Sequence, residues 1–164
     1  REVGHEMPLL TVVDAVNEQQ KRVLLGKLIG VLGEDLRNRR IAVWGLAFKP
    51  RTDDIREAPA LVLIDALLKR GATVTVHGPE ATANVHHLYG DRLHYAEQPY
   101  DALADADALA ICTEWEEYRN PDFAQMRERM RAPLVFDGRN LYEPDDMQAA
   151  GFAYHSIGRA SVGG

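Results

Sequence analysis

Short apolar runs alternate with amphipathic segments along most of this chain, and this alternation restricts the fold more than any other feature. The apolar runs are Ile41–Trp44, Thr73–Val76, Ala108–Ile111 and Leu134–Phe136, with Phe152–Tyr154 as a final edge strand. The helical segments between and after them are Pro59–Arg70, Tyr100–Asp105, Pro121–Arg131 and Pro144–Ala150. Strands and helices that alternate at this spacing predict an α/β fold, in which helices cover both faces of a parallel sheet.

A long helix is predicted before the first strand, over residues 11–36. Its apolar positions recur every three or four residues, and Thr11 is placed to cap its start. The apolar stripe comprises Val12, Val16, Val23, Leu24, Leu28, Val31 and Leu32. Gly26, Gly30 and Gly33 weaken the second half, so either the helix packs closely against a neighbour or it breaks there. We expect this stripe to be a self-association surface, with a homodimer as the simplest result.

Composition excludes several classes of function. The formal net charge is −6, whereas binding to nucleic acid requires clustered basic surface. No apolar stretch is long enough to cross a membrane. The single cysteine, Cys112, has no partner for an internal disulfide, so we expect a reducing, cytoplasmic compartment. The chain begins at Arg1 without Met and shows no signal peptide, and we expect it to be part of a longer polypeptide.

The segment after the first strand, residues 45–58, is the most unusual connection in the chain. Connections from a strand to a helix typically have about 2–6 residues. This one carries Lys49 and Arg56 among Asp53, Asp54 and Glu57, and it lacks the G-x-G-x-x-G pattern of dinucleotide-binding turns. Two interpretations remain open. The loop is either a solvated charged loop with internal ion pairs, or it is folded by its own aspartates and leaves its cations free for phosphates.

The same segment, GLAFKPRTDDIREAP, is similar to a signature of the UDP-glucose/GDP-mannose dehydrogenase family. Three further segments resemble that family in the same order: VNEQQK, ADALAICTEW and FDGRNLY, the last followed by Tyr154 and residues 157–159. The wording of the first motif resembles the UDP-glucose branch most. The resemblance extends over nearly the whole chain.

The resemblance implies an enzyme that oxidises the C6 hydroxyl of a nucleotide sugar to a carboxylate with NAD. Such enzymes have an NAD-binding domain, a central region with a long dimer-forming helix, and a C-terminal Rossmann-like domain that binds UDP. Accordingly, residues 1–37 are expected to belong to the central dimerisation helix region. Residues 38–164 are expected to form the C-terminal UDP-sugar-binding Rossmann-like domain.

The resemblance also assigns individual residues. Phe48, Lys49 and Arg139 match positions that contact the nucleotide sugar, and Arg56 matches an arginine that reaches the NAD phosphates. These residue types suit the ligand, because cations bind a pyrophosphate and an aromatic face packs against a base. One departure lies after the second strand, where the family often has Asp-Pro and this chain has His77-Gly78-Pro79.

The family's nucleophile is a cysteine in a segment that ends in Cys-Phe-Pro-Lys-Asp, and this chain has no such segment. Cys112 follows an apolar strand and is interpreted as a packing residue. We therefore assign no catalytic residue, and we expect the chain alone to lack dehydrogenase activity. NAD is expected to be bound mainly by the domain outside this chain.

Several other polar groups are weaker candidates. His86 and His87 are adjacent on a helix and point to different sides, so no metal site is expected there. Glu114, Glu116 and Glu117 are interpreted as a solvated turn above Trp115 rather than an acid–base cluster. Asp137 either orients Arg139 or caps a turn. Two alternative functions remain: the same family acting on GDP-mannose or a UDP-N-acetylhexosamine, and a stand-alone nucleotide-binding module.

Overall fold

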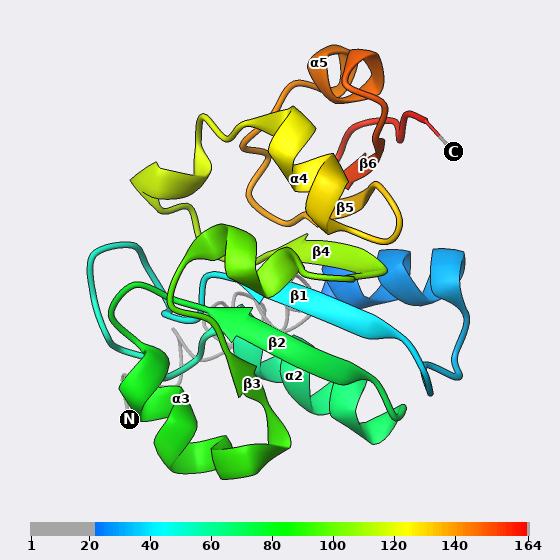
Figure 1. Ribbon diagram of the computed structural model, residues 1–164. Coiled ribbons are helices and arrows are strands. Elements are labelled where there is room, and N and C mark those ends of the chain that lie inside the picture. The colour runs from blue at the N-terminus through cyan, green and yellow to red at the C-terminus, as the bar shows by residue number, and fades with distance from the viewer. Residues whose placement is uncertain (1–21, 164) are drawn as a thin grey trace, which may run out of the picture.

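A six-stranded parallel sheet forms the centre of the molecule, in the order β3-β2-β1-β4-β5-β6 (Figure 1). The computed structural model describes residues 22–163. The strands are β1 (Arg40–Trp44), β2 (Thr73–His77), β3 (His94–Tyr95), β4 (Ala108–Ile111), β5 (Leu134–Asp137) and β6 (Ala153–Ser156). All strand pairs are parallel. This order is that of a Rossmann fold, so the predicted α/β class is confirmed.

Side chains of β1 alternate between two hydrophobic cores, one on each face of the sheet. Ile41 and Val43 belong to one core, and Ala42 and Trp44 belong to the other. The first core is covered by residues 22–32, α2 (Pro59–Lys69) and α3 (Thr82–Tyr89). The second is covered by the short helices η2 (Pro99–Leu103) and η3 (Glu116–Tyr118), with α4 (Phe123–Arg129) and α5 (Pro144–Ala149). The sheet is therefore buried on both faces.

Helix α2 forms where the sequence predicts it. Pro59 stands at its first position, where the missing N–H costs nothing. Its buried residues are Ala60, Leu63, Ile64 and Leu67, spaced at three and four positions. Gly71 follows the helix with a φ of 90°, which a glycine adopts without strain.

The first described helix covers residues 22–32 and is called the N-terminal helix below. Gly33 ends it with a φ of 90°, and its N–H donates to the carbonyl of Ile29 at 2.7 Å. The prediction of a helix to residue 36 is therefore wrong at this end, because Gly33 turns the chain. Leu36 is buried beyond the helix, in the same core. Residues 11–21 of the predicted helix lie outside the described part of the chain.

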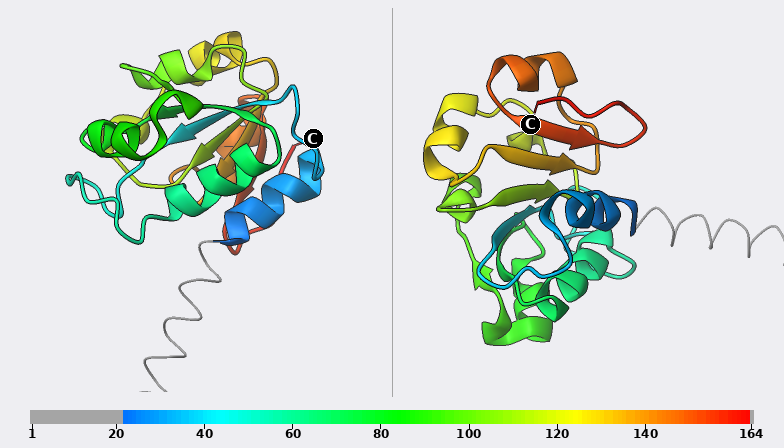
Figure 2. Two further views of the ribbon diagram at one scale, coloured as in Figure 1. Left: turned by 90° about the horizontal axis from the view of Figure 1, so that it is seen from below. Right: turned by 90° about the vertical axis from the view of Figure 1, so that its right-hand side faces the viewer.

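Some elements differ from the sequence pattern. The sequence does not predict α3 or β3. The segment predicted as helical over residues 100–105 contains a 3-10 helix, η2, that ends at Leu103, rather than an α-helix. A further 3-10 turn, η1 (Gly90–Arg92), follows α3. The N-terminal helix and α2 lie side by side on one face of the sheet (Figure 2). Within residues 22–163, no helix has the length and apolar character that a membrane crossing requires.

Candidate functional site

The carboxyl ends of the four central strands stand in one row. Trp44 pairs with His77 on one side and Ile111 on the other, and Ile111 pairs with Asp137. The loops that follow these residues therefore leave the sheet next to one another. This edge is where open parallel sheets bind their ligands.

The start of the loop after β1 packs closely against the chain that follows β4. Gly45 has a φ of 91°, and a β carbon on it would lie 2.6 Å from the backbone nitrogen of Thr113. Only glycine allows this approach. The Thr113 hydroxyl donates to the carbonyl of Ala47 at 2.6 Å, and this hydrogen bond is buried. The backbone that leads to Phe48 and Lys49 is thus fixed to the β4 end.

The outer part of the same loop is held by hydrogen bonds within the loop and by one from α3. The Phe48 N–H donates to the carbonyl of Asp54 at 2.7 Å, which closes the loop. The Asp54 N–H donates to the Thr52 hydroxyl at 3.2 Å, and the Asn84 side chain donates to the carbonyl of Asp53 at 2.9 Å. The loop extends beyond the end of β1 (Figure 2). These hydrogen bonds fix the shape of the loop.

Arg56 is held by the carboxylate of Asp54. Its Nε and Nη2 atoms donate to the two carboxylate oxygens, each at 3.0 Å, and its backbone N–H donates to Oδ1 at 3.0 Å. These hydrogen bonds lower the pKa of Asp54 to about 2. The Arg56 side chain is 87% exposed. Both interpretations of the loop are thus partly right: the aspartates fold it, and one of its cations forms a solvated ion pair.

Phe48 and Lys49 face solvent where this loop closes. Phe48 is 44% exposed, which is unusual for a large apolar side chain. The Lys49 Nζ atom lies 5.8 Å from the centroid of the Phe48 ring. An aromatic face and a primary ammonium group are therefore presented together.

Arg139 follows β5 and is held by Glu114, which follows β4. Its Nη2 atom donates to Glu114 Oε2 at 2.8 Å. Its backbone N–H donates to Asp137 Oδ1 at 2.9 Å. Asp137 therefore caps the turn, and Glu114 orients the guanidinium group. Burial is the largest single effect and raises the pKa of Glu114. The hydrogen bond and charge of Arg139, a backbone hydrogen bond and the charge of Arg119 together outweigh it, so the pKa is lowered overall.

The remaining acidic residues of this region do not form a cluster. Glu116 pairs with Arg119 at 3.9 Å, and Glu117 lies 3.8 Å from the Nε2 atom of His77. Trp115 is buried beneath the turn. The interpretation as a solvated turn above a packed tryptophan is confirmed.

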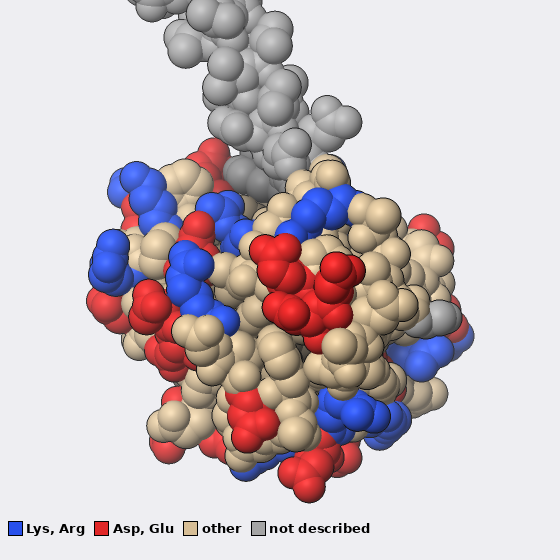
Figure 3. All heavy atoms as spheres, turned by 90° about the horizontal axis from the view of Figure 1, so that it is seen from above, with Lys and Arg blue, Asp and Glu red and all other residues tan. Residues whose placement is uncertain are grey.

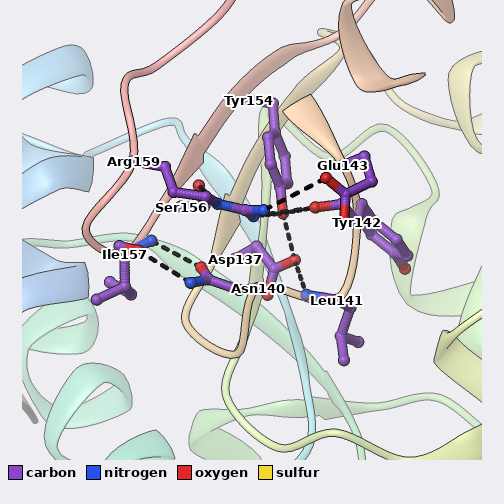
Figure 4. A network of polar contacts seen from close by, with 9 residues as sticks. All are labelled: Asp137, Asn140, Leu141, Tyr142, Glu143, Tyr154, Ser156, Ile157 and Arg159. Atoms are coloured by element: carbon purple, nitrogen blue, oxygen red, sulfur yellow. Dashed lines mark hydrogen bonds and ion pairs between the residues drawn. The ribbon is translucent and has the colours of Figure 1, made fainter. Parts of the chain in front are cut away.

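A buried network anchors the loop that carries Arg139 (Figure 4). The Oδ2 atom of Asp137 accepts hydrogen bonds from the Leu141 N–H at 2.7 Å and the Tyr154 hydroxyl at 2.6 Å. Arg159 donates to that hydroxyl at 3.1 Å and to the carbonyl of Tyr142 at 2.9 Å. The loop after β5 is thus tied to β6 by polar contacts at its base.

Three other features of the sequence lie outside the loop. Cys112 is 6% exposed, and burial raises the pKa of its thiol to about 12, so it packs as expected. No group of metal-binding side chains occurs within residues 22–163, and His86 and His87 are both exposed there. At the departure from the family motif, a β carbon on Gly78 would lie 2.8 Å from the Leu46 side chain. Glycine at this position therefore leaves room for Leu46.

The structure places Lys49 and Arg139 on the two sides of the β4 end. Thr113 connects to the loop that carries Lys49, and Glu114 connects to Arg139. Thr113 and Glu114 are the residues that sequence reasoning did not assign to the site. Their position directly after a buried strand was the signal available for them. On the face seen in Figure 3, Lys and Arg are interspersed with Asp and Glu and form no continuous basic surface.

Comparison with known proteins identifies the family of this domain. The model of the UDP binding domain of the UDP-glucose/GDP-mannose dehydrogenase family matches residues 42–144. The chain belongs to this family. It is 46% identical to a UDP-glucose 6-dehydrogenase from Pseudomonas aeruginosa over 98% of its own length and 36% of the relative. It is 45% identical to one from Rhizobium meliloti, over 94% of its own length and 36% of the relative.

Solved structures give the same result. A UDP-glucose dehydrogenase from Pyrobaculum islandicum superposes with a TM-score of 0.79 at 34% identity, over 97% of this chain and 34% of that one. An NDP-N-acetyl-D-galactosaminuronic acid dehydrogenase from Methanosarcina mazei superposes with a TM-score of 0.68 at 27% identity. The match covers 85% of this chain and 28% of that one. The chain therefore spans about a third of the length of these family members.

Proposed function

We propose that this chain binds the UDP part of a nucleotide sugar for an NAD-dependent UDP-glucose 6-dehydrogenase. In that enzyme the C6 hydroxyl of the sugar is oxidised to a carboxylate, which yields UDP-glucuronate. The observation that carries the proposal is the placement of Lys49 and Arg139 on either side of the β4 end. Family membership supports it independently.

Lys49 and Arg139 serve as charge-assisted donors to the ligand. A pyrophosphate is a dianion with several acceptor oxygens, and both cations lie on loops that leave the ligand-binding edge of the sheet. Phe48 offers its exposed ring as a packing surface for the base or ribose. Glu114 keeps the Arg139 side chain in one orientation before the ligand arrives.

Arg56 serves the cofactor instead. Its guanidinium group is solvent-facing and fits an anionic partner such as the NAD phosphates. NAD supplies the hydride acceptor when it is bound. The contribution of this chain is to bind and orient, because its one thiol, Cys112, is buried and has a raised pKa.

Two other substrates fit the family. GDP-mannose and UDP-N-acetylhexosamines carry the same diphosphate, and the relative from Methanosarcina mazei is named for an N-acetylated sugar. UDP-glucose is preferred because the relatives with 46% and 45% identity are UDP-glucose 6-dehydrogenases. A stand-alone nucleotide-binding module is the alternative without catalysis.

Calorimetric titration of the chain with UDP tests the proposal. Lys49→Ala and Arg139→Ala should each weaken UDP binding about ten- to a hundredfold, since each removes a charge-assisted hydrogen bond. Arg56→Ala removes a cation from the same loop and is the matched control, with a change of less than about threefold. If Arg56→Ala abolishes binding while the other two variants bind normally, the assignment of roles is wrong.

A further inference from the structure

The N-terminal helix contacts the loop that carries Arg139. A β carbon on Gly138 would lie 2.9 Å from the carbonyl oxygen of Ile111 and 3.3 Å from the Cδ2 atom of Leu24. Gly138 is therefore enclosed between the end of β4 and a side chain of this helix. It directly precedes Arg139, so whatever fixes Gly138 also fixes the starting point of the arginine side chain.

Leu24 lies closer to Gly138 than its neighbour Leu25 does, by the atoms nearest to the β-carbon position of Gly138. Leu24 and its neighbour Leu25 are buried to the same degree, at 7% and 8% exposure, and both belong to the core beneath the sheet. Leu25 is not among the three atoms nearest to the β-carbon position of Gly138, whereas two carbons of Leu24 are. The two leucines thus share their burial, and Leu24 is the one whose carbons lie nearest to the β-carbon position of Gly138.

The loop that carries Arg139 is held by hydrogen bonds on one side and by an apolar contact on the other. On the polar side, the Gly138 N–H donates to the carbonyl of Ile111 at 2.9 Å, and the N–H groups of Arg139 and Leu141 donate to Asp137. On the apolar side, Leu24 fills the space next to Gly138. Hydrogen bonds alone leave a turn room to shift, and a packed side chain removes that room.

We propose that Leu24 is a positioning residue for the nucleotide-sugar site. By packing against Gly138 it holds the backbone from which Arg139 reaches the ligand, so the N-terminal helix and UDP affinity are coupled. This inference rests on the proposed function only for the identity of the ligand. The coupling itself is a property of the protein without ligand.

The first experiment needs no ligand. Amide hydrogen exchange is measured by NMR in Leu24→Ala and in Leu25→Ala, its matched control. Both substitutions open a cavity in the same core, and similar decreases in melting temperature are expected. Leu24→Ala should accelerate exchange at Arg139 and Leu141 about tenfold relative to Leu25→Ala, because it is Leu24 that packs next to Gly138. Equal exchange in the two variants overturns the proposal.

The second experiment uses UDP as the probe. Leu24→Ala should raise the Kd for UDP about three- to tenfold, and Leu25→Ala less than twofold. Leu24→Met, which keeps the volume, should restore the affinity. Equal loss of affinity in both alanine variants shows a general effect of stability and overturns the proposal. If the unaltered chain does not bind UDP, the proposed function fails, and the exchange experiment still decides the positioning role of Leu24.

Discussion

The two arginines assigned to ligands are already paired with carboxylates of the protein. Arg139 pairs with Glu114, and Arg56 pairs with Asp54. Each arginine is therefore oriented before a ligand binds, and an incoming phosphate has to exceed or share the interaction with the carboxylate. Such a site favours a ligand that offers several acceptors over a single isolated anion.

The pairing of Glu114 gives a prediction on pH. Its pKa is lowered from 4.5 in the folded protein, so its contribution to stability is present above that value and is lost as the pH falls through the lower folded pKa. Glu114→Gln should reduce the free energy of unfolding at pH 7 by about 1 kcal/mol or less, because the pair is partly exposed. This difference should disappear in acid.

Urea denaturation of the two proteins between neutral and acidic pH measures the effect. Glu80→Gln is the control, because Glu80 is an exposed glutamate on the loop after β2, away from the Glu114–Arg139 pair in sequence, and its substitution should change stability little at any pH. A stability difference for Glu114→Gln that persists unchanged in strong acid would contradict the assigned ion pair.

The residues of the site differ in how far the sequence predicts them. Lys49 and Arg139 stand in the segments that follow predicted strands. Parallel strands bring such segments to one edge, so the shared location of the two residues follows from the pattern. The identity of the carboxylate that pairs with Arg139 does not follow from the sequence pattern. Three glutamates surround Trp115, and only the geometry of the turn after β4 directs Glu114 to Arg139. Long-range pairing of this kind depends on side-chain directions that the sequence does not reveal.

At the scale of elements, the outermost strand β6 stabilises the loop before α5. Tyr154 on β6 donates its buried hydroxyl to Asp137 at the end of β5, and Arg159 packs beside it. Asp137 is fully buried, so every lost donor leaves part of a carboxylate without compensation. The edge strand therefore maintains the position of the neighbouring loop as well as closing the sheet.

Tyr154→Phe tests this relation. The variant keeps the ring and removes one donor to Asp137, so unfolding should become easier by about 1–3 kcal/mol. Tyr95→Phe is the control: its hydroxyl donates to the carbonyl of Gly90 in a half-buried position, and its loss should cost about 0.5–1 kcal/mol. Chemical denaturation compares them. Equal costs would indicate that the Asp137 network contributes no special stability.

Elements with strong periodicity were predictable, and those without it were not. Helix α2 has an apolar stripe, a proline at its start and a glycine after its end, and it was found as predicted. Helix α3 buries only Val85 and Tyr89, so its sequence lacks a stripe. The predicted end of the N-terminal helix is wrong for a physical reason. Gly33 adopts a positive φ and ends the helix, whereas the apolar pattern of the sequence continues to Leu36. The sequence showed that the helix could break but not at which glycine.

At the scale of the whole molecule, the N-terminal helix has two sides. Leu24 and Leu28 pack into the core of this chain, so the expectation that the whole stripe is a free surface is wrong for them. Val31 is 48% exposed, and Gly26 and Gly30 are exposed with it. This narrower face remains the proposed surface for a homodimer. The division of the chain after residue 37 also remains a proposal.

Val31→Glu tests the dimer. A charge on the exposed face should shift sedimentation from dimer to monomer, because the apolar contact would have to bury an unpaired carboxylate. Leu88→Glu is the control, since Leu88 is an equally apolar and exposed residue (55%) on α3. It should leave the oligomeric state unchanged. A chain that sediments as a monomer at every concentration, even without substitution, would contradict the proposal.

The two borders of the sheet also affect how copies of the chain meet. At one border, β3 spans only His94–Tyr95. At the other, Tyr154 of β6 exchanges backbone hydrogen bonds with Val162, so the returning chain covers that strand. Neither border offers a long ladder of free amides and carbonyls, the template on which amyloid-like stacking grows. Crowding or heating of the folded chain should therefore give few fibrils, and fibril growth should require prior unfolding.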